Sequence, residues 1–223
     1  MRRSLALLLI LCLLCPAIRA EETEKYVALT FDDGPSGRFT RRLLEGLEQR
    51  GVKATFLLCG YRLKDYPAVG KAIFDAGHEI GLHSYSHNDM GKMNYADAAR
   101  EITDTRALLP AGCKPAFLRP PGGSCGAPAT QACKDAGLAL LGWSVDPRDW
   151  CSSDAAAVEA AVVTTVRSGD IILLHDMSDS SVDAALAIVD RLLEQGFRFV
   201  TVSELAAAAG VIPKPGVLYN RFS

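Results

Sequence analysis

The chain has 223 residues, of which 49% are hydrophobic, and its formal net charge at pH 7 is −2. This length suits one sizeable hydrophobic core. The charge balance and the lack of a basic run argue against nucleic-acid binding, and no stretch after the N-terminus is apolar enough to span a membrane.

Residues 1–20 are predicted to be a signal peptide. Met1–Arg3 is basic, Leu5–Cys15 is apolar, and Ile18–Ala20 is a plausible cleavage site. Its removal takes away three arginines and no acids, which leaves 21 basic side chains against 26 acidic ones and a net charge of −5. We therefore expect an exported protein, secreted or associated with the cell wall. An uncleaved segment kept as an N-terminal anchor is the alternative.

Five cysteines remain after this cleavage, and an oxidising compartment would allow four of them to pair. The spacing does not give the connectivity, and no CxxC pair indicates a thiolate zinc site. The five are Cys59, Cys113, Cys125, Cys133 and Cys151.

Strand-like and helix-like segments alternate along the rest of the chain. The predicted strands are 25–31, 54–59, 78–83, 116–119, 138–145, 170–174 and 197–202. The predicted helices are 39–49, 64–76, 95–109, 128–136, 154–167 with Asp154 as its cap, 182–195, and 203–209 capped by Ser203. Seven strand–helix units indicate a single-domain α/β fold, which we expect to close as a distorted (β/α)7-type barrel over residues 21–210. Residues 211–223 form a tail, expected to be an ordered strap.

Polar residues stand at or just after the ends of these strands. In parallel α/β barrels, the carboxyl ends of the strands meet on one face, where active sites gather. The sequence therefore predicts one shared site, made of Asp32, Asp33, His83, His87, Arg119, Asp149 and His175.

The first of these groups is a pair of adjacent carboxylates, Asp32 and Asp33, followed by a Gly-Pro that cannot continue the strand. Neighbouring side chains of an extended chain point to opposite sides, so the two acids are expected to have different roles unless the turn brings them together. At least one needs a cation or a shared proton. A solvated turn is the alternative.

His83 and His87 are four residues apart, a spacing that places both imidazoles on one side of a helical turn. With one carboxylate they would make a two-histidine, one-carboxylate metal set that leaves coordination positions open. His78, at the entry of a predicted strand, is expected to be structural.

Arg119 precedes a stiff Pro-Pro-Gly-Gly turn. It either steadies a carboxylate or lies on the surface at a corner fixed by proline, and the N–H groups of Gly122 and Gly123 could face an oxyanion. Trp143 is expected in the core and Trp150 on the wall of a groove.

His175 ends a fully apolar strand. A histidine in this position, near a carboxylate, can be held charged as a proton donor.

In their order along the chain, five motifs resemble those of the polysaccharide deacetylases, carbohydrate esterase family four, which include nodulation-type chitooligosaccharide deacetylases. The resemblance covers roughly residues 25–205. The motifs are Thr30–Pro35, His83–His87, Arg119–Gly123, Asp146–Trp150 and Leu173–Asp176.

The resemblance implies a divalent metal, with zinc favoured over cobalt, nickel or manganese, held by Asp33, His83 and His87. It also implies that Asp32 is the general base for a metal-activated water. Arg119 would tune this base.

The resemblance further implies that His175, paired with Asp149, is the general acid. The Gly122 N–H would help to hold the oxyanion, and Pro121 and Trp150 would contact the substrate. Family members often carry an aromatic residue where this chain has Gly122, so one wall of the groove would differ here.

The implied function is a secreted metal-dependent hydrolase that removes N-acetyl groups from N-acetylglucosamine-containing polysaccharide, with peptidoglycan favoured. Deacetylation of chitin oligomers or O-acetylated xylan is the alternative, and a catalytically silent carbohydrate-binding barrel is a further one. The expected partner is the polysaccharide, with no nucleic acid and no stable membrane span after processing. We expect a monomer.

Overall fold

The computed structural model describes residues 24–223. The predicted signal peptide and the alternative anchor lie outside these residues. The strands are β1 (Lys25–Asp32), β2 (Thr55–Leu58), β3 (Glu79–Leu82), β4 (Phe117–Leu118), β5 (Ala139–Leu141), β6 (Ile171–His175), β7 (Phe197–Phe199) and β8 (Leu218–Tyr219). The helices are α1 (Phe39–Gln49), α2 (Gly60–Asp65), α3 (Pro67–Asp75), α4 (Tyr95–Arg106), α5 (Ala127–Asp135), α6 (Ala155–Val163), α7 (Asp179–Glu194) and α8 (Val202–Ala208). Two 3₁₀ turns, η1 (Pro121–Gly123) and η2 (Asp149–Cys151), complete the chain order.

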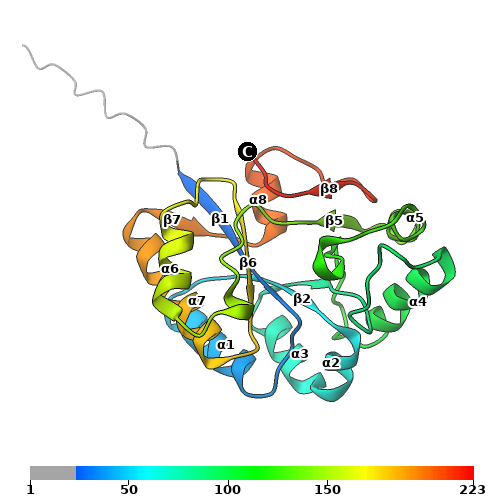
Figure 1. The fold of residues 1–223 in the computed structure, drawn as a ribbon, viewed down its shortest axis with the longest axis horizontal. Coiled ribbons are helices and arrows are strands. Elements are labelled where there is room, and N and C mark those ends of the chain that lie inside the picture. Colours follow the sequence, from blue (N-terminus) through cyan, green and yellow to red (C-terminus); the bar gives the residue numbers. More distant parts are fainter. Residues whose placement is uncertain (1–23) are drawn as a thin grey trace, which may run out of the picture.

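The strands form one parallel sheet in the order β6-β1-β2-β3-β4-β5-β8, with β7 beside the first part of β1. The chain just after β5 swings across to β6, where Val145 forms a bridge with Ile172. The sheet therefore curls, and α1, α3 and α7 lie along its outer face (Figure 1), whereas α8 packs on the cluster inside the curl. The predicted single α/β domain of barrel type is confirmed.

Strand β1 shows how the pleat places the site. Alternate residues of a strand point to opposite faces. Val27, Leu29 and Phe31 belong to the core cluster shared with α1 and α7, whereas Ala28 belongs to a second cluster inside the curled sheet. The inner row continues from Ala28 through positions 30 and 32, so the sheet aims Asp32 inward at the end of the strand.

Several boundaries differ from prediction for local reasons. The helix expected over 64–76 is two helices that break at Tyr66, because Pro67 disfavours a helical conformation in the residue before it. Helix α8 begins at Val202 and is capped by Thr201 in a capping box with Glu204, so Ser203 is not its cap. Asp154 caps α6 as predicted, and α7 begins earlier than predicted, capped by Ser178.

The tail is part of the sheet. β8 pairs in parallel with β5, Arg221 bridges Asp170 beside β6, and Phe222 is buried in the inner cluster. The predicted strap is thus ordered, and the predicted domain boundary at residue 210 falls before a strand of the same sheet.

Within residues 24–223 all five cysteines are free thiols. His78 is buried, as expected of a structural residue, and its Nδ1 accepts from the Ala54 N–H at 3.1 Å. No helix in this part of the chain has the length and apolar character that a membrane crossing needs.

Candidate active site and metal centre

Arg119 and Asp32 form a buried ion pair at the centre of the site. The guanidinium is completely buried, and its Nη1 donates to Asp32 Oδ1 at 2.7 Å and to Thr30 Oγ1 at 2.8 Å. Its Nη2 donates to Gly142 O at 2.8 Å, and its face lies over the Trp143 ring. Arg119 is therefore no surface residue, and its charge-assisted hydrogen bond fixes the position of the Asp32 carboxyl group.

Asp33 leaves the strand in a left-handed conformation, with φ 71°. The turn brings both acids to one imidazole, because His83 Nε2 lies 3.3 Å from Asp33 Oδ1 and 3.8 Å from Asp32 Oδ2. His87 Nε2 lies 3.0 Å from the same Asp33 oxygen. One carboxylate oxygen thus faces two histidine nitrogens.

The hydrogen bonds of His83 define which nitrogen faces the site. Its Nδ1 lies 2.7 Å from Arg119 O, a carbonyl that can only accept, so this nitrogen carries the hydrogen. The Nε2 lone pair then points at Asp33 Oδ1, which is buried and has no hydrogen-bond partner among the described residues. Two facing acceptors are stable together only with a proton or a cation between them.

The donor set fits a divalent metal. One ligand atom each from Asp33, His83 and His87 lies within 4.8 Å of the other two. Imidazole and carboxylate suit zinc and similar ions, and the bond from His83 Nδ1 to a backbone carbonyl is the usual support of a metal-bound histidine. The His87 side chain is 42% exposed, which leaves room for water and substrate.

The pKa values of Asp33 and His87 reflect this arrangement. Burial alone would raise the pKa of Asp33, but its close contacts with the His83 and His87 imidazoles hold that pKa far below the usual range. The contact with Asp33 raises the pKa of His87, against the effect of burial. A metal ion would replace the protons that these contacts now hold.

All four non-glycine residues with left-handed backbone in residues 24–223 lie in the loops around this centre. They are Asp33, Ser84, His87 and Arg148. Such conformations cost energy for ordinary residues and cluster at functional sites. The backbone geometry alone therefore picks out these loops.

His175 and Asp149 form the second buried pair. His175 Nδ1 lies 2.8 Å from Asp149 Oδ1, and the His175 N–H donates to Asp149 Oδ2 at 2.9 Å. Burial would lower the pKa of His175, but the bond to Asp149 and the charges of Asp149, Asp32 and Asp33 raise it to about 9. The imidazole is thus protonated at neutral pH, and its Nε2 remains to donate.

The turn after Arg119 differs from expectation at one glycine. The Gly123 N–H donates to Pro120 O at 2.9 Å, so it does not face an oxyanion. Gly122 is exposed in a left-handed conformation, with φ 62°, and its role as an oxyanion donor stays a prediction. Pro121 is buried, where it shapes the turn.

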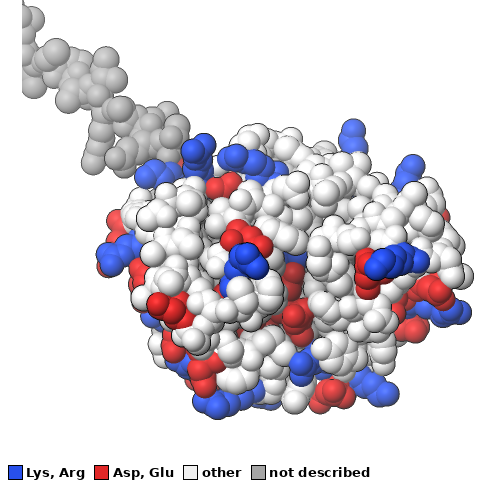
Figure 2. All heavy atoms as spheres, viewed as in Figure 1, with Lys and Arg blue, Asp and Glu red and all other residues white. Residues whose placement is uncertain are grey.

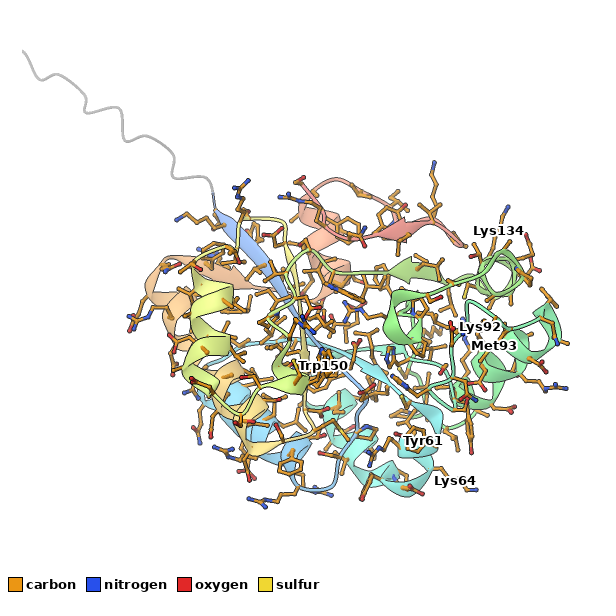
Figure 3. The ribbon with its side chains drawn as sticks, in the orientation of Figure 1. Tyr61, Lys64, Lys92, Met93, Lys134 and Trp150 are labelled. Carbon is orange, nitrogen blue, oxygen red and sulfur yellow. The ribbon has the colours of Figure 1, made fainter. Side chains whose placement is uncertain are left out.

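Trp150, in η2, is 61% exposed and lies against the Arg148 guanidinium, whereas Trp143 packs on the inner core. Figure 3 shows Trp150 near the middle of the view, with Tyr61 and Lys92 to its right. Acidic atoms lie in a hollow near the centre of the same face (Figure 2). The site is therefore open and shallow.

Asp176 is a buried acid to which sequence analysis gave no role. It accepts from Thr40 Oγ1, its Oδ1 has no partner among the described residues, and burial raises its pKa to about 6. A Cβ on Gly34 would stand 2.7 Å from that oxygen. Asp176 thus supports the turn that carries Asp33. Its position next to His175 was the only signal in the sequence.

A sequence model of the family Polysaccharide deacetylase matches residues 19–141. Peptidoglycan-N-acetylglucosamine deacetylase of Bacillus cereus is 39% identical over 188 residues, which are 82% of this chain and 88% of that protein. Chitooligosaccharide deacetylase of Sinorhizobium fredii is 34% identical over 77% of this chain and 87% of its own length. The chain spans 41% of the longer PgdA of Listeria monocytogenes, at 33% identity.

Among solved structures, a family 4 acetyl xylan esterase of Clostridium thermocellum in complex with cobalt superposes with a TM-score of 0.82 at 36% identity. The superposition covers 88% of this chain and 98% of that one. Sequence, fold and the Asp-His-His set agree, and the chain belongs to the polysaccharide deacetylase family.

Proposed function

We propose that the protein is an exported, metal-dependent N-deacetylase that acts on N-acetylglucosamine units of peptidoglycan. The observation that supports this most strongly is the pairing of Asp32 with His175. The two residues end neighbouring parallel strands at matched positions, so a base and an acid stand one strand spacing apart, about 4.8 Å. The candidate metal ligands lie beside them.

Each residue then has a defined task. Asp32, held in place by Arg119, takes the proton from the attacking water. A bound divalent metal supplies Lewis-acid polarisation and lowers the pKa of water. The Gly122 N–H donates to the oxygen on which negative charge develops. His175 gives its Nε2 proton to the leaving amine, so acetate and a free amino sugar result.

The relatives and the open site both support peptidoglycan as the substrate. Peptidoglycan deacetylases stand first among the relatives, and an exposed Trp150 beside a shallow hollow suits a long glycan chain. Chitin oligomers and O-acetylated xylan are the second candidates, because a chitooligosaccharide deacetylase and an acetyl xylan esterase also match over most of the chain. Zinc as the metal, a monomeric state and export to the cell wall belong to the same proposal.

The test is acetate release from purified peptidoglycan, chitin oligomers and acetylated xylan, compared side by side. We expect the fastest release from peptidoglycan, its loss with a chelator and its return with zinc. Asp32→Asn, which keeps the size of the side chain, is expected to lower the rate 10²- to 10⁴-fold. Release that survives this substitution would exclude Asp32 as the base. No release from any substrate would leave a carbohydrate-binding barrel instead.

A further inference from the structure

The loop that carries both histidines of the metal set, residues 83–87, needs outside support. Ser84 and His87 both have left-handed backbone, with φ 61° and 60°. Side chains disfavour this region, so such a conformation persists only where the surroundings hold it. His87 is also largely exposed, and core packing does not fix it.

Glu101, on α4, supplies a support that lies outside the five motifs. Its Oε2 accepts from the Tyr85 N–H at 2.7 Å and from the Ser86 N–H at 2.8 Å, and its Oε1 accepts from Ser86 Oγ at 2.7 Å. A single carboxylate thus binds three donors between the two histidines. Hydrogen bonds to an ionised acceptor are the stronger kind.

The start of α2 also holds this loop, because its N–H groups donate to two carbonyls of the loop. The Gly60 N–H donates to Ser84 O and the Tyr61 N–H to Tyr85 O, each at 3.0 Å. A Cβ on Gly60 would come within 2.3 Å of the Tyr85 ring, so the contact is close. The N–H groups of Tyr85 and Ser86 are bound by Glu101 and not by α2.

From these contacts we propose that Glu101 is a positioning residue for the metal centre, because its carboxylate keeps His83 and His87 at ligand spacing before an ion binds. Without it, the two N–H groups would turn to water and the loop could relax from its left-handed conformation. The ion would then have to order the loop on binding, and its affinity would fall. The inference rests on the proposed metal site but not on any particular substrate.

Asp104 is the matched control for Glu101. It lies three residues further along α4 and is exposed. Asp104 and Glu101 both line a surface hollow beside α4, which has a volume of about 470 Å³. Asp104 makes no hydrogen bond with the loop among those found in the described part of the chain. Removing Asp104 therefore takes away a nearby negative charge but not the support.

The experiment compares the unchanged protein with Glu101→Ala, Glu101→Gln, Asp104→Ala and His87→Ala. Zinc affinity is measured by competition with a chromogenic chelator, and amide exchange at Tyr85 and Ser86 is measured in the metal-free protein. We expect Glu101→Ala to lower the affinity about 10-fold or more, in the range seen when outer partners of metal ligands are lost. The two amides should exchange faster.

Glu101→Gln should recover most of the affinity, because its amide oxygen can still accept from both N–H groups. Asp104→Ala should change neither measurement. Affinity of Glu101→Ala within twofold of the unchanged protein would overturn the proposal, and so would an equal loss in Asp104→Ala.

If Glu101→Ala does not fold, Glu101→Met takes its place, because it keeps the length of the side chain without a strong acceptor. Unchanged exchange at both amides in this variant, with unchanged affinity, would also overturn the proposal. If the unchanged protein and His87→Ala bind zinc equally weakly, the metal site itself fails, and the proposal for Glu101 fails with it.

Discussion

Asp32 and Arg119 are joined at 2.7 Å inside the curled sheet, and neither side chain is more than 4% exposed. Arg119 holds both Asp32 and the surrounding sheet, since it also binds Thr30 and the carbonyl of Gly142 after β5. The same guanidinium that positions the proposed base thus links β1, the end of β4 and the chain after β5.

Arg119→Met should therefore destabilise the protein strongly, because it leaves the buried charge of Asp32 without a partner. We expect a loss of about 3–5 kcal/mol in the free energy of unfolding at pH 7, measured by urea denaturation. Arg38→Met is the control, since its pair with Asp179 is exposed and should contribute less than about 1 kcal/mol. Equal losses in the two variants would contradict a special role of the buried pair.

The histidines should separate into two classes by metal content. His87→Ala removes an exposed ligand, so we expect loss of bound zinc with little change in the stability of the metal-free protein. His78→Ala removes a buried acceptor of the Ala54 N–H, so we expect about 1–3 kcal/mol of lost stability and unchanged zinc content. Elemental analysis and urea denaturation test both. A His78 variant that loses zinc in its folded state would refute this division.

The pH profile of kcat/KM should report His175. Its folded-state pKa, about 9, lies above the ordinary value of 6.5, so the proton donor is present at neutral pH and is lost on the alkaline side. We expect an alkaline limb at about pH 9, which Asp149→Asn should move to lower pH because it removes the charge that favours the imidazolium. A limb at the same pH in both proteins would remove His175 from the proton-donor role.

Asp176 should make the free energy of unfolding fall as pH rises, whereas an ion-paired acid makes it increase. Burial raises its folded-state pKa to about 6, above the ordinary value of 3.8. The folded protein keeps this proton when the unfolded chain has lost it, so stability falls as pH rises from about 4 to 6, by about 3 kcal/mol. Asp176→Asn should remove that slope in urea denaturation at several pH values. An unchanged slope would show that other groups cause it.

The alternation of strand-like and helix-like segments along the sequence was enough to predict the parallel α/β fold. The polar residues at the ends of the strands were enough to predict which side chains lie together. Strand β1 shows why, because an apolar run that ends in Asp32 and Asp33 can only present them at the edge of the sheet. Helix α1 has the predicted bounds for the same reason, a regular apolar face.

Contacts between distant segments could not be predicted in this way. The carbonyl of Gly142 that receives Arg119, and the N–H groups that Glu101 receives, depend on how strands and loops meet in three dimensions. Glu101 looks in the sequence like any acid on a helix. Gly123 failed as an oxyanion donor because turn geometry, which composition does not specify, uses its N–H.

The closing of the sheet by β8 has a consequence for handling the protein. The Leu140 N–H donates to Val217 O at 2.9 Å, and the Gly142 N–H donates to Tyr219 O at 2.8 Å, so two carbonyls of the tail pair with β5 and the residue after it. A chain shortened after residue 210 would present that row of β5 as a bare edge beside apolar Leu141, ready to recruit a strand from another molecule. We expect the shortened protein to form oligomers or precipitate on refolding, as light scattering would show, whereas the full chain stays dispersed.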